Sequence, residues 1–248
     1  FELYIIKKSE LLDPNSLKSY LIENKITILW LTAPLLNQLC ENHPDMFKTV
    51  RCLLTGGDVL SPKHINLIRK VCPDLTIING YGPTENTTFS TCFTINDYYN
   101  DSIPIGYPIS NSTCYIVSQD MNLLPIGIPG ELVVGGDGVA KGYINNQAFT
   151  DLKFLSSPFN NDFLYKTGDL AKWNFDGSIS FIGRIDGQVK IRGFRVELGE
   201  INLKILEFPN IKTSFTTIKT INGEKFICSY IVCNQMLNVE DLKHFLMN

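Results

Sequence analysis

The sequence is poor in several features that mark common classes of protein. It has three histidines and no C-x-x-C pair among its seven cysteines, which disfavours a zinc module. Its net charge of −3 argues against the clustered positive surface that nucleic-acid binding requires. The most apolar run, 26–36, is interrupted by Thr27, Thr32 and Pro34 and is too short to span a bilayer. With no signal-peptide pattern either, we expect a cytoplasmic protein with reduced thiols and with neither nucleic acid nor membrane as a partner.

Two glycine motifs of common enzymes are also missing. The glycines at 135, 136, 138 and 142 lack the G-x-G-x-x-G spacing of a dinucleotide-binding loop, and no crossover helix pattern follows them. No G-x-S-x-G nucleophile elbow occurs. Dinucleotide binding and acyl-enzyme hydrolysis are therefore disfavoured, and a glycine-rich hairpin is the better interpretation of the first motif.

The first 80 residues alternate between helix signals and short apolar runs. A cap residue followed by proline predicts three helix starts, at Asp13-Pro14, at Thr32 before Ala33-Pro34, and at Ser61-Pro62. Between them, apolar runs predict strands covered on both faces, at 26–31, 51–54 and 75–78. This pattern is typical of a sheet with crossover helices.

The later sequence changes in character. From about 89 to 183, short β runs at 113–117, 131–134 and 179–182 predict a distorted antiparallel barrel or sheet. After Asp186, we expect a smaller unit: strand 188–191, helix 197–207, a hairpin through Asn222-Gly223, and helix 239–247.

Two loop sequences predict a nucleotide site. In Tyr81-Gly82-Pro83-Thr84-Glu85, a tight turn presents an aromatic ring, a hydroxyl and a carboxylate, which could stack a base, contact a phosphate and hold Mg²⁺. Further on, Asp169 offers two acceptor oxygens for the hydroxyls of a ribose, and Arg184 offers a fork of donors for phosphate or ribose oxygens. Taken singly, the first loop could be an ordinary turn and Asp169 a simple cap.

Four longer stretches, in this order, carry a resemblance to a known family. They are NGYGPTE at 79–85, GELVVGGDGVAKGY at 130–143, YKTGDLAKW at 165–173 and GRIDGQVKIRGFRVELGEI at 183–201. The chain resembles the adenylate-forming superfamily from about Leu3 to Phe245, and most closely the amino-acid-activating (adenylation) domains of nonribosomal peptide synthetases.

The resemblance implies an α/β plus β fold. Residues 1–185 correspond to the C-terminal part of the large N-terminal domain, an α/β sheet followed by a distorted β-barrel. Residues 186–248 correspond to a truncated small α+β lid domain that rotates about Asp186. The resemblance also implies that, in the second half-reaction of the family, Lys190 and Gly193 contact the pantetheine arm of a carrier domain. The simpler reading of Lys190 is a residue on a solvated strand face.

The implied reaction joins an amino acid to the α-phosphate of ATP and passes it to the phosphopantetheine thiol of a peptidyl carrier domain. The expected partners are that carrier domain and a condensation domain of the same synthetase, with ATP and Mg²⁺ as cofactors. Thr84, Glu85 and Arg184 are the expected catalytic residues, and Glu85 is the expected metal ligand. The expected nucleotide contacts are Gly56, Gly57, Asn79, Tyr81, Gly82, Thr84, Asp169, Phe181 and Arg184.

Among these nucleotide contacts, the glycine pair has a simpler interpretation, and Phe181 departs from the residue that is usual in the family. Gly56-Gly57 could be only a strand-to-helix turn, and Phe181 stands where the family often has tyrosine, so a hydroxyl contact is lost.

A set of six residues matches the amino-acid pocket of valine-activating members: Trp30, Leu54, Gly56, Gly80, Thr88 and Phe89. On sequence alone, the simpler reading of Trp30 is a core residue.

The family's phosphate loop and its substrate-binding aspartate correspond to positions before Phe1, and its catalytic lysine to a position after Asn248. We therefore expect a fragment that is incomplete for catalysis. An acyl-CoA or aryl-CoA ligase, and a non-catalytic fragment or pseudo-domain, are the alternative functions.

Overall fold

In the computed structural model, which describes residues 2–160, 162–185, 188–191, 194–221 and 224–247, the chain divides into two units. They are Phe1–Ile185 and Asp186–Asn248. The expected hinge Asp186, the expected carrier contact Gly193 and the expected turn Asn222-Gly223 lie outside the described residues.

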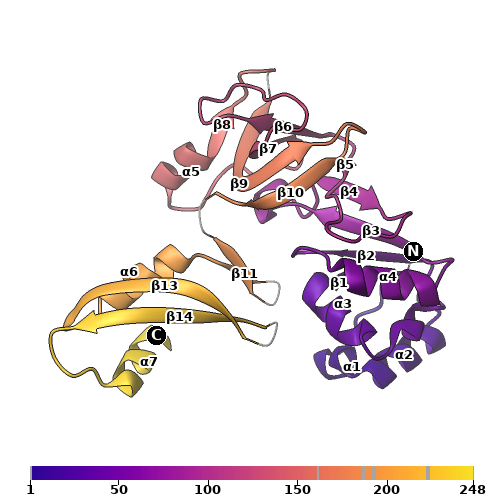
Figure 1. Ribbon diagram of the computed structural model, residues 1–248, viewed down its shortest axis with the longest axis horizontal. Coiled ribbons are helices and arrows are strands. Elements are labelled where there is room, and N and C mark those ends of the chain that lie inside the picture. The colour runs from indigo at the N-terminus through magenta and orange to yellow at the C-terminus, as the bar shows by residue number, and fades with distance from the viewer. Residues whose placement is uncertain (1, 161, 186–187, 192–193, 222–223, 248) are drawn as a thin grey trace. The chain divides into compact units, whose positions relative to one another are not determined.

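The first sheet has the order β1-β2-β3-β4-β5. Its strands are β1 (Ile28–Thr32), β2 (Cys52–Gly56), β3 (Thr76–Tyr81), β4 (Thr91–Thr94) and β5 (Tyr107–Pro108). The first three are parallel and lie on the predicted apolar runs, whereas β4 and β5 add antiparallel strands. The prediction that the region after 89 belongs to the second sheet is wrong for β4 and β5, which extend the first sheet (Figure 1).

The helices of this part are α1 (Lys8–Leu12), α2 (Pro14–Glu23), α3 (Ala33–Cys40) and α4 (Pro62–Val71), with a 3₁₀ turn η1 (Pro44–Phe47). Three of them, α2, α3 and α4, begin where the cap and proline signals predicted, whereas the short helix α1 was not predicted. Asp13 caps α2 as expected, because its Oδ2 accepts the Ser16 N–H at 2.8 Å. Ser61 differs: its hydroxyl contacts His64 Nδ1 at 2.8 Å.

One face of the first sheet packs into a core, and the other does not. Leu31, Leu53 and Ile77 join the buried cluster formed with the helices. On the opposite face, the side chain of Ile28 is 50% exposed and that of Trp30 is 43% exposed. The prediction that β1 is covered on both faces was wrong, and so was the simpler reading of Trp30 as core, because an apolar run does not specify what packs on each face.

The second sheet is antiparallel, with the order β10-β9-β7-β6 and β8 beside β9. Its strands are β6 (Ser112–Val117), β7 (Gly130–Gly136), β8 (Phe154–Ser156), β9 (Phe163–Trp173) and β10 (Ile179–Arg184). Its core includes Leu132, Val134 and Tyr165. Helix α5 (Gln147–Lys153) was not predicted, although Asn146 signals its start by accepting the Phe149 N–H at 3.1 Å.

Among its described residues, the second unit has one short ladder (β11–β12), one long ladder (β13–β14) and two helices (Figure 1). Its elements are β11 (Val189–Ile191), β12 (Phe194–Val196), α6 (Leu198–Leu206), β13 (Ile211–Ile221), β14 (Glu224–Cys233) and α7 (Val239–Met247). The predicted helices and hairpin strands are present, with Ile221 paired to Glu224. Ile205 of α6 and Leu242 of α7 are buried.

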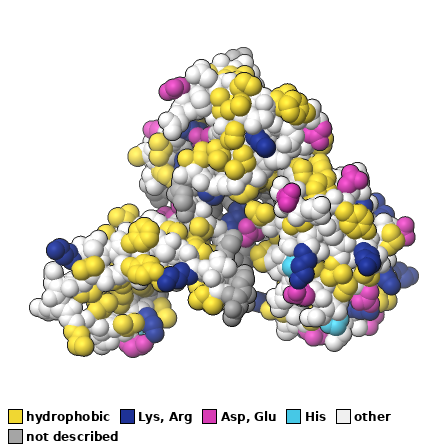
Figure 2. Space-filling view, in the orientation of Figure 1, with side chains coloured by type: hydrophobic (Ala, Val, Ile, Leu, Met, Phe, Trp, Pro, Cys, Tyr) yellow, Lys and Arg dark blue, Asp and Glu magenta, His cyan; other side chains and the backbone are white. Residues whose placement is uncertain are grey.

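The surface and the thiols agree with the composition. On the face drawn in Figure 2, basic and acidic side chains are interspersed. All seven cysteines are free thiols. Within the described ranges, none of the helices combines the length and apolar character needed to cross a bilayer.

Candidate functional site

The loop after β3 is tightly folded against the segment that follows it. A Cβ on Gly82 would lie 2.6 Å from the Thr88 carbonyl oxygen, so glycine is needed for the two limbs of the loop to meet. The 3₁₀ turn η2 (Thr84–Asn86) follows, with Thr84 exposed and Glu85 only 9% exposed. The loop therefore presents a hydroxyl at its surface beside a nearly buried carboxylate.

Two successive threonines hold an unusual backbone conformation after this turn. Thr87 has φ 42° and Thr88 has φ 68°, in the left-handed region that β-branched residues rarely adopt. The Thr87 hydroxyl donates to the Gly138 carbonyl at 2.7 Å, and the Ser90 N–H donates to the Tyr81 carbonyl at 2.7 Å. Strain of this kind persists where neighbouring contacts hold it, and it is frequent at binding sites.

A bulge in β9 sets the direction of Asp169. On β7, Leu132 pairs with Asp169 but Val133 pairs with Lys166, so Thr167 and Gly168 have no opposite residue in the ladder. Gly168 has φ 72°, and the Asp169 N–H donates to the Thr167 hydroxyl at 2.9 Å. Bulges commonly redirect a side chain next to a functional site.

Tyr81, Asp169 and Arg184 form one buried network. The Tyr81 hydroxyl donates to Asp169 Oδ2, and Arg184 donates to Asp169 Oδ1 at 2.7 Å and to the Thr167 carbonyl at 2.9 Å. The side chains of Arg184 and Asp169 are 18% and 8% exposed. Burial, and then the charge of Asp169, raise the pKa of Tyr81 well above its ordinary value, so its hydroxyl remains a donor. The structure thus brings together three of the predicted nucleotide contacts, but it places them on strands β3, β9 and β10 and not in loops as predicted.

Glu85 is held by a second tyrosine. The Tyr143 hydroxyl donates to Glu85 Oε1 at 2.6 Å and lies 3.3 Å from the Tyr165 hydroxyl. Burial, and then the hydrogen bond to Glu85, raise the pKa of Tyr143. The Ala140 N–H also donates to the Glu85 carbonyl at 2.8 Å.

Three further predicted nucleotide contacts are Gly57, Phe181 and Asn79. Gly57 follows β2 with φ 77°, and a Cβ there would meet only a methyl of Thr32 at 3.9 Å. Phe181 packs against the core cluster that contains Tyr81. Asn79 is buried and donates to the Pro104 carbonyl at 2.8 Å, on the sheet face opposite Gly80. Asn79 therefore shares a face of β3 with Tyr81, and its side-chain amide binds the Pro104 carbonyl.

The six predicted pocket residues gather at one end of the first sheet. Trp30 pairs with Leu54, and Gly56 pairs with Gly80, so these four share a face of the sheet. The Phe89 ring lies over Gly80, since a Cβ there would come within 2.5 Å of it, and it contacts the Trp30 ring edge-on with centroids 5.3 Å apart. Thr88 is the exposed residue before Phe89.

The second unit places Lys190 on β11, opposite Arg195 on β12. Lys190 is half-buried.

The donor set at Glu85 fits Mg²⁺ in one particular way. Within the part of the chain that the structure describes, no three His, Cys, Asp or Glu side chains gather to hold a metal ion. A single carboxylate suits Mg²⁺ when substrate phosphates and water supply the other ligands. The residues present therefore fit Mg²⁺ bound together with a nucleotide.

The sequence analysis missed Tyr143, Tyr165 and Thr167 as members of the site. Tyr143 and Tyr165 stand in two of the family-like stretches, at the end of GELVVGGDGVAKGY and at the start of YKTGDLAKW. The signal was available there, but only the fold shows that the Tyr143 and Glu85 side chains meet across 58 positions of sequence.

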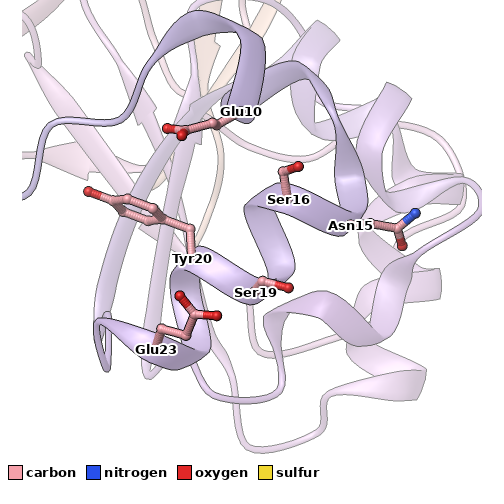
Figure 3. Close-up of a pocket in the computed structure, with 6 residues that line it drawn as sticks. All are labelled: Glu10, Asn15, Ser16, Ser19, Tyr20 and Glu23. Carbon is pink, nitrogen blue, oxygen red and sulfur yellow. The ribbon is translucent and has the colours of Figure 1, made fainter.

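A separate hollow lies on α1 and α2, away from these residues (Figure 3). Its lining residues are Glu10, Asn15, Ser16, Ser19, Tyr20 and Glu23. None of the predicted site residues lines it.

Comparison with known proteins shows the family. A family model described as "AMP-binding enzyme" matches residues 1–144, which is more than half of the chain. The chain therefore belongs to the AMP-binding enzyme family. It is 51% identical over 247 residues to gramicidin S synthase 2 of Brevibacillus brevis, and 50% identical over 243 residues to tyrocidine synthase 3 of Brevibacillus parabrevis. These matches cover 99% and 97% of this chain but only 6% and 4% of those synthases.

Solved structures agree with this assignment. Holo-PA1221, an NRPS protein containing adenylation and PCP domains, is 36% identical with a TM-score of 0.83, covering 90% of this chain and 40% of that one. IdnL1 has a TM-score of 0.86 at 20% identity, covering 98% of this chain and 51% of that one, and supports the fold alone. The predicted adenylate-forming fold and the predicted resemblance to peptide-synthetase adenylation domains are confirmed.

Proposed function

We propose that this chain is part of an adenylation domain that activates a small branched aliphatic amino acid, with valine as the best candidate. ATP is the second substrate, and the product passes to the pantetheine thiol of a peptidyl carrier domain. The observation that carries the proposal is the Tyr81–Asp169–Arg184 network, which joins strands β3, β9 and β10 and links two residues 88 positions apart. It lies in the same unit as the Trp30–Phe89 cluster.

In the proposed first step, a carboxylate oxygen of the amino acid attacks the α-phosphorus of ATP, and the bond to pyrophosphate breaks. Catalysis of this step needs positioning and charge stabilisation, with no protein nucleophile. The exposed Thr84 hydroxyl donates to a phosphate oxygen in this proposal. Glu85 holds Mg²⁺, which offsets phosphate charge when it is bound.

Asp169 and Arg184 bind the nucleoside in the proposal. A carboxylate accepts about four hydrogen bonds in all, so Asp169 can accept ribose hydroxyls while it keeps its bonds to Tyr81 and Arg184. Tyr81 then packs its ring against the base, and Gly57 leaves open space on the other side.

In the second step, the pantetheine thiolate attacks the acyl carbon, a thioester forms and AMP leaves. We propose that residues 186–248 act as the lid in this step, with Asp186 as the hinge and with Lys190 and Gly193 near the arm. This part of the proposal rests on the family resemblance and on the carrier domain present in holo-PA1221.

The relatives support the peptide-synthetase branch over an acyl-CoA or aryl-CoA ligase, since gramicidin S synthase 2 and tyrocidine synthase 3 are matched over nearly all of this chain. The test is amino-acid-dependent exchange of pyrophosphate into ATP by the protein that carries this chain. Exchange with valine supports the proposal. Adenylation of fatty or aromatic acids in place of amino acids would favour a CoA ligase, and no nucleotide binding at all would favour a non-catalytic role.

A further inference from the structure

The contact between Tyr143 and Glu85 joins two separate parts of the first unit. The hydroxyl of Tyr143 donates to Glu85 Oε1 at 2.6 Å. The Glu85 side chain has three rotatable bonds and would be mobile on an open loop, which would make each binding event order it anew. Here it is nearly buried, and a hydroxyl contacts the carboxylate itself.

Tyr143 is in turn held from several directions. Its ring lies between those of Phe149 and Phe154, at centroid distances of 4.9 and 5.4 Å. Its N–H donates to the Thr150 hydroxyl at 2.9 Å, and its own hydroxyl lies 3.3 Å from that of Tyr165. A side chain fixed by packing and by hydrogen bonds can fix its neighbour in turn.

The backbone around Glu85 is fixed by other residues of the same segment. The Ala140 N–H donates to the Glu85 carbonyl at 2.8 Å, and the Thr87 hydroxyl donates to the Gly138 carbonyl at 2.7 Å. These bonds hold the turn in place, whereas Tyr143 acts on the side chain. The two effects can therefore be separated by removing one hydroxyl.

We propose that Tyr143 is a positioning residue for adenylation: its hydroxyl fixes the Glu85 carboxylate in the orientation that faces the nucleotide phosphates and their divalent cation. The inference rests on the proposed function and names a residue that acts through Glu85. Outer residues that orient a metal ligand commonly change metal affinity by about 10- to 100-fold when they are replaced.

The test replaces one hydroxyl at a time in the protein that carries this chain. Tyr143→Phe keeps the ring between Phe149 and Phe154. Tyr115→Phe is the matched control, because the Tyr115 hydroxyl accepts a bond from Asn160 at 3.2 Å and its ring packs on Phe159 instead. The readout is Mn²⁺ affinity in the presence of a non-hydrolysable ATP analogue, measured by electron paramagnetic resonance without any amino acid.

We expect Tyr143→Phe to weaken Mn²⁺ binding about tenfold in a protein that stays folded, and Tyr115→Phe to have no effect on Mn²⁺ binding. Equal affinities in the two variants overturn the inference. If Tyr143→Phe does not fold, Thr150→Val is tested in its place. This variant removes the Thr150 hydroxyl that accepts the Tyr143 N–H, and it keeps the Tyr143 hydroxyl that contacts Glu85. A smaller loss of Mn²⁺ affinity in Thr150→Val supports the inference, and no loss overturns it.

A double-mutant cycle separates positioning from general support of the fold. In a Glu85→Gln background, Tyr143→Phe should have little further effect on Mn²⁺ affinity, because the residue through which it acts has already changed. The same loss in both backgrounds overturns the inference. If the unmodified protein binds no Mn²⁺ with the ATP analogue, the proposed function fails first and the inference falls with it, so the two failures are distinguishable.

Discussion

Asp169 carries a charge in a nearly buried position, and the structure engages both of its carboxylate oxygens. Tyr81 donates to one and Arg184 to the other. An ionised carboxylate paired in this way is costly to leave without a partner, so these three side chains stabilise one another. In the proposed function, the same bonds fix the direction from which a ribose would approach.

Replacement of Asp169 by alanine should weaken nucleotide binding. Each hydrogen bond to a charged acceptor contributes about 1.5 to 3 kcal/mol, so loss of the ribose contacts alone should lower ATP affinity roughly tenfold or more. The measurement is calorimetric titration with an ATP analogue. Asp176→Ala is the control, since Asp176 is an exposed residue that accepts bonds from Ser178, two residues further on. Unchanged ATP affinity in Asp169→Ala would show that Asp169 does not bind the nucleotide.

At the scale of secondary-structure elements, the ends of strands β2 and β3 approach each other closely. A Cβ on Gly56 would lie 1.9 Å from the Gly80 carbonyl oxygen, which is a backbone atom that cannot rotate away. The Phe89 ring covers Gly80 in the same way. The end of the first sheet therefore depends on glycine at two adjacent strands, and both glycines belong to the six residues of the proposed pocket.

Gly56→Ala should destabilise the first unit. Forcing an extra carbon against backbone costs on the order of 3 kcal/mol in the free energy of unfolding. Gly183→Ala is the control, because a Cβ there would meet nothing within 4 Å. The check is urea unfolding of both variants. A Gly56→Ala protein as stable as the Gly183→Ala protein would mean that β2 and β3 do not approach as described.

Local signals were enough to predict several elements. The helices α2, α3 and α4 begin at the predicted proline positions because a cap residue and the fixed φ of proline act within one turn. Helix α5 was missed because glycine- and asparagine-rich sequence surrounds it. The positive φ of Thr88 was also missed, since threonine carries no sequence signal for that conformation.

Long-range contacts could not be predicted in the same way. The residues of the Tyr81–Asp169–Arg184 network were named from the motifs, but the bonds among them depend on two strand registers and a bulge in β9. The Tyr143–Glu85 bond was not predicted at all. The exposure of Trp30 depends on what packs against β1, which an apolar run cannot report.

At the scale of the whole molecule, the chain divides at Ile185 and Asp186. In the proposal, the second unit takes one orientation for adenylation and another for thiolation, with Asp186 as the hinge. Proline at this position would fix φ near −65° and remove a backbone donor.

Asp186→Pro should therefore spare one half-reaction and block the other. The two rates are measured separately in the protein that carries this chain, as pyrophosphate exchange and as loading of the carrier thiol. Asp176→Pro, at an exposed turn, controls for a general effect of proline on folding. Equal loss of both half-reactions in a folded Asp186→Pro protein would refute the hinge.

The choice of amino-acid substrate tests the central claim most directly, because activity with valine requires both the nucleotide network and the Trp30–Phe89 cluster. The measurement is pyrophosphate exchange across the amino acids, carried out with the protein that carries this chain. We predict the highest rate with valine and a visible secondary rate with isoleucine, because one methylene in an apolar pocket is worth only about 1 to 3 kcal/mol. Charged amino acids should fail, since none of the six pocket residues can pair a buried charge. A preference for an acidic, basic or aromatic amino acid over valine would contradict the proposed pocket. If none of the amino acids supports exchange, the account as a whole is contradicted.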